Sequence, residues 1–471
     1  MMFFLGHTRS RAFVTVSAAG ALGAALCLAG LGTGAASGAG PAFSNTPLIA
    51  TGNLPNGFTT SPVAGSTGDS EPAIAFGADG RMAVDGLAWL PFQVNLWQGQ
   101  FGTTPDYFGA MDTMLPKHGK GRTALGSGDA DVEVTGAGTT LLTDLDFFVN
   151  PPFTKFQLGV SVTRCPAGAA GPGDCTTALL DQAGADRPWI TTVGRTAYVS
   201  WHDSQSSSLI RVMKSTDDGR TWRHARSPIT GLGGVTGSST FNNQHGPIVA
   251  DPTTGDVFQV FATGVPQTKG HSADYNNIWV TRSTDGARSW TASRVFHAPR
   301  GTQLANIFPA LAVDSTTGTV WAAWTDLHGV AVSSSTDHGR TWSDPTTVST
   351  ATTTVMPWVA ARDGKVDVVY YATEATSPAD QTAVWNTFDS QLSGGAWKVL
   401  QVSNTPNRVG AVCLEGSGCA EDRQLLDLFE VAEDPITGQA AVVYTDSTLS
   451  TYTDASGATH ELPEIVLAFE N

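Results

Sequence analysis

The chain has 471 residues, a formal charge of −16 and 41% hydrophobic residues. This length allows one large domain or two to three ordinary ones, with enough apolar residues for a buried core. An acidic chain without basic clusters is not typical of proteins that bind nucleic acids or anionic membranes, so we expect neither class of partner. The 52 glycines and only 14% charged residues favour many short strands joined by turns.

Residues 1–39 have the layout of a secretory signal peptide and its processing region. Arg9 and Arg11 precede an apolar run, "VTVSAAGALGAALCLAGLG", and small residues follow it. We expect cleavage near Ala36 or Ala39, which would leave a secreted, extracellular protein. The sequence contains no second long apolar run, so we expect no membrane span.

Four further cysteines form two local pairs. Cys165 and Cys175 bracket "PAGAAGPGD", and Cys413 and Cys419 bracket "LEGSG". An even count in an exported chain favours two disulfides, Cys165–Cys175 and Cys413–Cys419, each closing a small loop. Zinc binding is the competing interpretation, but the spacings differ from those of zinc ligands and no histidine is close. We therefore expect no metal at these cysteines.

An eight-residue phrase occurs three times, as "STDDGRTW" at 215–222, "STDGARSW" at 283–290 and "STDHGRTW" at 335–342. Before each copy the sequence reads as three strands joined by turns, and the phrase turns the chain into a fourth strand. The same unit recurs without the phrase, with anchors 50 to 65 residues apart at Glu71, Asp129, Asp186, His245, Phe308, Trp358 and Arg423.

Seven such units predict an all-β propeller of seven four-stranded blades. Six blades with an irregular N-terminal segment are the alternative, because the first unit is the least regular. The segment "NTPLIATGNL" (45–54) is expected to supply a strand that closes the ring against the last blade.

The phrase resembles the Asp-box, Ser-x-Asp-x-Gly-x-Thr-Trp, of sialidases and other BNR-repeat propellers. The copy at 283 departs from it at Ala287 and Ser289, and a frayed fourth copy ends at Trp397. The resemblance implies one propeller domain over residues 40–471. We expect the boxes to be structural, with aspartates that accept turn N–H bonds, glycines at positive φ and tryptophans packed between sheets: Asp217, Gly219, Trp222, Asp285, Trp290, Asp337, Gly339 and Trp342.

Propeller geometry places candidate chemistry on the face opposite the boxes. The starts of the first strands lie there and contribute Glu71, Asp129, Asp131, Asp186, Arg187, His245, Trp358, Asp422 and Arg423. The ends of the second strands repeat a pattern that presents Asp144, Asp203 with His202, Asp326 and Asp446. Either each of these aspartates caps the next turn, or they line a mouth that binds sugar hydroxyls or a cation such as calcium.

The resemblance to sialidases implies three arginines, a tyrosine activated by a glutamate and an aspartate as acid and base at that face. The candidate catalytic residues are Asp186, Arg187, Asp422, Arg423, Asp129, Tyr371 and Glu374. The family's Arg-Ile-Pro motif is missing, and a third arginine is not evident beyond Arg300 or Arg408 on loops. An acidic mouth repels an anionic sugar unless its acids are locally paired, and the Asp-Arg steps Asp186–Arg187 and Asp422–Arg423, as neighbours from different blades, are the pairs we expect. We therefore do not expect ordinary exo-sialidase activity.

Two functions remain open at this point. One is a sialidase-like hydrolase that cleaves a glycan by an exo-glycosidase mechanism through two carboxyl groups, with no cofactor required. The other is a non-catalytic propeller that binds a glycan or an extracellular protein. We expect a monomer in either case.

Overall fold

The computed structural model describes residues 42–90, 92–111, 123–149, 156–181, 184–203, 209–231, 243–265 and 274–471. The expected signal peptide and both of its cleavage positions lie outside these ranges. Within them, no helix is long and apolar enough to cross a membrane. The described structure is built from strands, with short 3-10 turns at Pro172–Asp174 (η2) and Gly416–Gly418 (η4).

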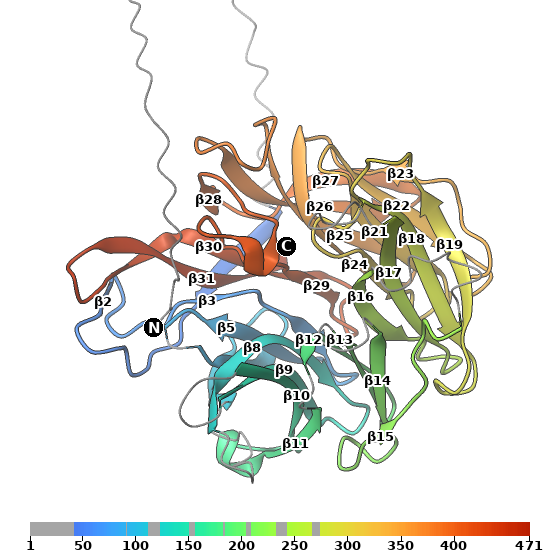
Figure 1. Cartoon of the computed structure of the whole chain (residues 1–471), viewed down its shortest axis with the longest axis horizontal. Coiled ribbons are helices and arrows are strands. Elements are labelled where there is room, and N and C mark those ends of the chain that lie inside the picture. Colours follow the sequence, from blue (N-terminus) through green and yellow to red (C-terminus); the bar gives the residue numbers. More distant parts are fainter. Residues whose placement is uncertain are drawn as a thin grey trace, which may run out of the picture. The chain divides into compact units, whose positions relative to one another are not determined.

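The strands form seven sheets, which confirms the all-β propeller with seven blades and rules out the six-blade alternative (Figure 1). The innermost strand of each sheet contacts the innermost strand of the next, so the seven close a ring in the order β4, β8, β12, β16, β20, β24, β29 and back to β4. Blade one consists of β3 (Asp69–Ser70), β4 (Ile74–Phe76), β5 (Arg81–Ala88), β6 (Val94–Gln100) and β7 (Asp106–Ala110), and blade two of β8 (Thr123–Val134), β9 (Thr140–Val149), β10 (Phe156–Cys165) and β11 (Thr176–Asp181). Blade three consists of β12 (Ala185–Val193), β13 (Thr196–Asp203), β14 (Ile210–Ser215) and β15 (Arg223–His224). Blade four consists of β16 (Asn243–Ala250), β17 (Val257–Val265), β18 (Asp274–Ser283) and β19 (Thr291–His297).

The remaining three blades include the one that closes the ring. Blade five consists of β20 (Ala310–Val313), β21 (Val320–Thr325), β22 (Val330–Ser335) and β23 (Thr346–Thr347). Blade six consists of β24 (Thr353–Arg362), β25 (Lys365–Thr373), β26 (Val384–Ser393), β27 (Ala396–Gln401) and β28 (Arg408–Val409). Blade seven consists of β29 (Glu430–Glu433), β30 (Ala440–Thr453), β31 (Thr459–Glu470), β1 (Phe43–Leu48) and β2 (Thr59–Ser61). Strand β1 pairs with β31 from Phe43 opposite Glu470 to Leu48 opposite Ile465. The N-terminal segment therefore supplies the outer strand of the last blade, as its sequence predicts.

The blades pack through side chains that alternate along each strand. In β13, Ala197, Val199 and Trp201 face a buried cluster shared with blade two, whereas Tyr198 faces the large central cluster. This period of two is the one that a strand buried on both faces needs. Every blade packs against two neighbours, and Trp189 of blade three also contacts Phe308 and Trp358 of blades five and six, so the apolar core extends across the ring.

Each Asp-box fixes the turn between the third and fourth strands of blades three, four and five. In the last copy, Asp337 Oδ1 accepts hydrogen bonds from the N–H groups of Arg340 and Thr341 at 3.0 and 2.9 Å, and Oδ2 accepts from the Thr341 hydroxyl at 2.6 Å. Ser335 Oγ accepts from Gly339 N at 2.8 Å. The same pattern surrounds Asp217 and Asp285.

The other box positions have packing and backbone roles. The tryptophans Trp222, Trp290 and Trp342 are partly buried against clusters that neighbouring blades share. Gly219 and Gly339 have φ values of 76° and 75°. The frayed copy before Trp397 has a different turn, because Gly394 and Gly395 alone connect β26 to β27.

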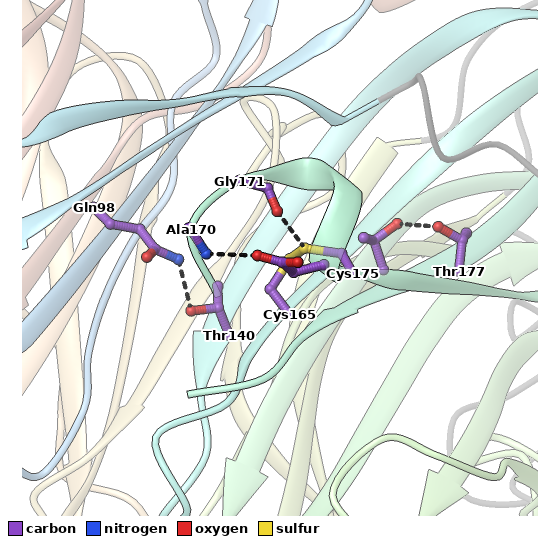
Figure 2. The surroundings of a disulfide bond; sticks show 9 residues. Gln98, Thr140, Cys165, Ala170, Gly171, Cys175 and Thr177 are labelled. Carbon is purple, nitrogen blue, oxygen red and sulfur yellow. Dashed lines mark hydrogen bonds between the residues drawn. A yellow bond between two sulfur atoms is a disulfide. The ribbon is translucent and has the colours of Figure 1, made fainter. Parts of the chain in front are cut away.

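Both predicted disulfides are present. Cys165–Cys175 joins β10 to the start of β11, so it ties in blade two the hairpin that an Asp-box fixes in blade three (Figure 2). Inside the loop, Asp174 Oδ2 accepts a hydrogen bond from Ala170 N at 2.9 Å. Cys413–Cys419 closes a loop before the last blade, on the opposite face from the boxes.

Candidate functional site

The inner strands are distorted where they reach the face opposite the boxes. Register shifts interrupt four of them, at Ser127/Ala130 in β8, Asp186/Trp189 in β12, His245/Ile248 in β16 and Val355/Trp358 in β24. A proline follows the distorted residue in Glu71-Pro72, Arg187-Pro188, Gly246-Pro247 and Met356-Pro357. Proline has no N–H to continue the ladder, and a bulge re-aims the adjacent side chain, so these positions turn side chains toward the middle of the ring.

Asp186 and His245 at two of these distorted positions, with Asp129 and Arg187 beside them in sequence or space, line a large cavity of about 1290 Å³. It receives seven of the predicted candidate residues: Asp129, Asp186, Arg187, His202, His245, Asp422 and Arg423. Asp427 also lines it, and one wall is the disulfide-closed segment from Ala411 to Arg423. Phe147, Leu158, Phe308 and Leu327 provide apolar wall. The cavity is thus acidic and polar at the inner strands, and its remaining lining combines apolar side chains with polar ones such as Gln303, Gln381 and Glu421.

A chain of ion pairs crosses the base of this cavity. Arg187 Nη1 pairs with Glu71 Oε1, and Nη2 donates to Ala130 O at 2.9 Å. Glu71 Oε2 accepts from Asp427 N at 3.3 Å, and Asp427 Oδ2 pairs with Arg423 Nη2 at 2.6 Å. Burial raises the pKa of Glu71 and the charge of Asp129 adds to this, while the Arg187 guanidinium opposes it. The chain places two arginines against two carboxyl groups.

The ion pairs differ from those expected from the two Asp-Arg dipeptides. Arg187 pairs with Glu71, and Arg423 pairs with Asp427, whereas Asp422 accepts from Gln381 Nε2 at 2.9 Å and lies 3.3 Å from Arg408 Nη2. The expectation that Asp186–Arg187 and Asp422–Arg423 pair with each other is therefore corrected. The reason is the local backbone, since Arg187 and Asp422 have φ values of 44° and 61°.

Asp186 at this cavity has a raised pKa, which is the property that a general acid needs. Burial, together with the charges of Asp129 and Asp427, raises the pKa of Asp186 to about 7. Asp129 is half-buried and lines the same cavity from blade two. Burial likewise raises the pKa of Asp427, with the charge of Arg423 opposing it. One carboxyl group that holds its proton near neutral pH therefore lies close to a second carboxylate.

The two histidines of the cavity lie against each other. Their ring centroids are 5.8 Å apart, and His245 Nε2 lies 3.0 Å from Arg187 O. Burial, with the neighbouring His202, holds the pKa of His245 well below 6.5. His245 is therefore neutral near pH 7 and adds no positive charge to the cavity.

Arg408 holds the disulfide-closed wall of the cavity. It is buried, donates to Ala411 O from Nε at 3.2 Å and from Nη2 at 3.1 Å, and pairs with Glu461 through Nη1. Arg300, the other loop arginine considered as a third anion ligand, is exposed and does not line the cavity.

The candidate nucleophile pair does not reach the cavity. Tyr371 is fully buried, its hydroxyl accepts from Thr445 N at 2.9 Å, and burial raises the pKa of this phenol. Glu374 is exposed and accepts from the Thr352 hydroxyl at 2.9 Å. A buried phenol and an exposed carboxylate, each with another partner, cannot act together as a nucleophile and its base.

The four aspartates of the second strands have local partners and do not line the cavity. Asp326 and Asp446 accept from the N–H group two residues further on, at 3.0 and 2.7 Å, as the turn-capping interpretation predicts. Asp203 pairs with Arg211 at 2.6 Å. Asp144 lies inside β9 and not at its end, because that strand continues to Val149, and it accepts from two serine hydroxyls.

Two other candidates lie in a smaller cavity. Asp131 and Trp358 line a space of about 340 Å³ between the inner strands, with Glu133, Glu430 and Arg362. Asp131 accepts from Ile190 N at 2.8 Å, and burial raises the pKa of Asp131 to about 7. Among the residues that the structure describes, no three His, Cys, Asp or Glu side chains are grouped so that they could hold a metal ion.

Sequence reasoning missed Asp427 as part of this site, and it missed the role of Arg408 in holding the wall of the cavity. Asp427 is four residues after Arg423 in "DRQLLD", a spacing that brings the two side chains together here, so the signal was present. Arg408 was considered only as a ligand for an anion. Its partner Glu461 is 53 residues away, and no local pattern indicates that pairing.

Comparisons with known proteins agree with the repeat pattern. Residues 191–420 match the sequence model of the BNR repeat-like domain. No curated protein matches the chain by sequence. One similar solved structure is a protein of unknown function from Dyadobacter fermentans, with 11% identity, a TM-score of 0.45 and coverage of 92% of this chain and 100% of that one. A second is a NanB sialidase variant from Streptococcus pneumoniae, with 11% identity, a TM-score of 0.40 and coverage of 85% of this chain and 68% of that one. A third is an α-L-arabinanase from Penicillium chrysogenum complexed with arabinobiose, with 11% identity, a TM-score of 0.43 and coverage of 69% of this chain and 94% of that one.

Proposed function

The chain is a sialidase-like BNR-repeat β-propeller, and from this premise we propose that it hydrolyses neutral glycans in the cavity opposite its Asp-boxes. The single observation that carries the proposal is Asp186, a carboxyl group with a pKa of about 7 that faces the cavity beside Asp129. A glycosidase needs one carboxylic acid to protonate the leaving oxygen and a second carboxylate to act as nucleophile or to activate water. Asp186 suits the first role and Asp129 the second.

The charge balance supports a neutral substrate. Arg187 is paired with Glu71, Arg423 with Asp427, and Arg408 with Glu461 and Asp422. An anionic sugar would have to displace one of these carboxylates and enter the field of Asp129 and Asp186. Neutral hydroxyl groups can instead exchange hydrogen bonds with both acids and amides of the cavity. These observations argue against sialate as the substrate.

The dimensions of the cavity support a glycan longer than one sugar. Ligand pockets for small molecules are about 300–1,000 Å³, and this cavity is about 1290 Å³. Phe147 and Phe308 add apolar surface against which the C–H face of a sugar ring can pack. We therefore extend the exo-type expectation to oligosaccharides bound over several sugar positions.

Export of the chain is part of the proposal. The two disulfides support an oxidising compartment, because such bonds are rare in reducing cytosol. Expression of the full chain followed by mass spectrometry of the exported protein should give an N-terminus near residue 37 or 40. Recovery of a protein that retains residues 1–36 would contradict cleavage there.

A glycan-binding propeller without turnover is the second candidate. It is favoured by the positions of Tyr371 and Glu374, because neither member of this candidate nucleophile pair lines the cavity. Both candidates use the same cavity and differ only in whether Asp186 transfers a proton. Binding measurements and rate measurements therefore separate them.

The test is a panel of substrates on the purified protein. It should include aryl glycosides and oligosaccharides of arabinose, galactose, xylose and mannose, and an aryl sialoside. We expect release of aryl alcohol or reducing sugar from at least one neutral substrate and none from the sialoside. Hydrolysis of the sialoside alone would contradict the neutral-glycan proposal. Binding of a neutral oligosaccharide by calorimetry without any turnover would select the second candidate.

A further inference from the structure

We infer that Glu71 is a positioning residue, which acts through Arg187 and Asp427 to fix the acid Asp186 at the cavity. Glu71 itself does not line the cavity, and its side chain is only 1% exposed. Its two carboxylate oxygens bind two residues that do line it, Arg187 through the guanidinium and Asp427 through the backbone N–H. The inference rests on the proposed function only in taking Asp186 as the acid.

The Glu71–Arg187 pair joins five of the seven blades at one point. Glu71 belongs to blade one and donates its N–H to Thr445 Oγ1 of blade seven at 3.2 Å. Arg187 belongs to blade three and donates to Ala130 O of blade two, and its carbonyl oxygen lies 3.0 Å from His245 Nε2 of blade four. A group with partners on five blades sets the relative positions of the inner strands from which the cavity residues project.

The backbone of this pair is also fixed. Glu71 and Arg187 both have positive φ values, 54° and 44°, and both precede a proline. Non-glycine residues rarely adopt this conformation, and it persists where surrounding contacts determine it. The Arg187 guanidinium also lies over the Trp189 ring, 4.0 Å from its centroid. Asp186, next in the chain to Arg187, is held on this same distorted segment.

Removing either member of the pair should change the charge that Asp186 experiences. The charged or titratable groups that face Asp186 are Asp129 from β8, Asp427 before β29, Arg187 on its own strand and His202 opposite it on β13. Asp129 and Asp427 raise the pKa of Asp186, and Arg187 lowers it. Without Glu71 the Arg187 charge loses its paired acid and is opposed only by the more distant Asp129, Asp131 and Glu430, and without Arg187 the acids keep Arg423 as their positive neighbour. The two substitutions should therefore move the pKa of Asp186 in opposite directions.

The experiment compares Glu71→Gln and Arg187→Met in the full exported chain. The pKa of the Asp186 carboxyl is measured by NMR titration of carboxyl-labelled aspartate, assigned with Asp186→Asn. We expect a pKa about 1 unit lower in Glu71→Gln and about 1 unit higher in Arg187→Met. On a neutral substrate, kcat/KM should fall about 10- to 100-fold for Glu71→Gln, because small displacements of a catalytic group are costly. Arg187→Lys, which keeps the charge and loses the two-point contact, should retain the pKa and lose rate.

Asp218→Asn is the matched control. Asp218 is also buried and pairs with Arg164 between blades two and three at 2.7 Å, but on the Asp-box face. It should lower thermal stability and leave both the Asp186 pKa and kcat/KM unchanged. Identical behaviour of Glu71→Gln and Asp218→Asn in the titration would overturn the positioning role. Because the titration needs no turnover, a failure of hydrolysis alone contradicts the proposed function and leaves the positioning role standing on the pKa values.

Discussion

The two faces of this propeller use the same residue type in opposite ways. On the box face, the hydroxyl of Thr221 and other donors hold the pKa of Asp217 at about 2, and hydrogen bonds likewise lower the pKa values of Asp285 and Asp337. On the opposite face, burial raises the pKa of Asp186 to about 7. Aspartates at the surface turns that are surrounded by donors stay charged and fix those turns. Buried aspartates close to other acids keep protons, which is the property that acid catalysis needs.

The largest effect that this comparison predicts is the loss of activity in Asp186→Asn. An amide cannot transfer the proton, so kcat should fall about 10²- to 10⁴-fold on any neutral substrate that the wild type cleaves. The box variant Asp285→Asn should keep wild-type kcat, since Asp285 only bonds its own turn. Steady-state kinetics of both variants tests this. Equal losses in the two would remove the functional distinction between the faces.

The stability of the fold should rise when the pH is lowered from 8 to 5. A carboxyl group whose pKa is higher in the folded state than in the unfolded chain holds its proton more tightly in the folded state. The free energy of unfolding therefore falls as the pH rises from about 4, where the group begins to ionise in the unfolded chain, to about 7, where it ionises in the folded state. Asp131 and Asp186 titrate at about 7, and Asp446 at about 6, in the folded state. We expect a gain of at least about 2 kcal/mol between pH 8 and pH 5.

The box aspartates limit this trend at its acid end. Their pKa values are lowered on folding, so the stability they give is complete above about pH 4 and is lost as the pH falls toward 2. Denaturant titrations from pH 3 to 8 should therefore show a maximum near pH 5. A free energy of unfolding that rises steadily from pH 5 to 8 would contradict the raised pKa values of Asp131, Asp186 and Asp446.

Removal of the disulfide from the hairpin of blade two tests whether this bond takes the place of an Asp-box. Cys165 and Cys175 are separated by 10 positions, and opening so small a loop should cost about 2.7 kcal/mol by the loop-entropy estimate. Cys165→Ser with Cys175→Ser should lower the thermal midpoint and leave kcat unchanged, because this hairpin lies away from the cavity. Loss of activity at a temperature where the variant is fully folded would contradict that separation.

The smallest effect concerns the glycines of the boxes. Gly339→Ala should cost about 1 kcal/mol, because its φ of 75° is unfavourable for alanine. Gly219→Ala should cost more, since the added Cβ would lie 2.6 Å from Leu141 Cδ2, whereas the nearest atom at Gly339 is 3.4 Å away. Chemical denaturation of the two variants measures the difference. Ala287 takes φ 66° in the middle box, so the fold itself tolerates alanine there.

Local sequence patterns predicted the framework of this protein well. The repeated turn phrase, the period of the units and the cysteine spacing each depend on residues a few positions apart, and they led to the seven blades, the closing strand and both disulfides. The partners in the cavity did not follow, because Glu71 and Arg187 are 116 positions apart and Asp427 is 356 from Glu71. The X-Pro steps of the inner strands were a readable sign of bulges, and they indicate which residues turn inward.

The most direct test of the contrast between the two faces is an NMR titration of the aspartate carboxyl groups in the folded chain, with Asp186→Asn and Asp285→Asn for assignment. The account predicts that Asp186 titrates near pH 7, while Asp285 stays ionised well below the usual range of an aspartate. An Asp186 that titrates near pH 4, together with Asp285, would contradict it, because no acid would then be protonated at the cavity near neutral pH.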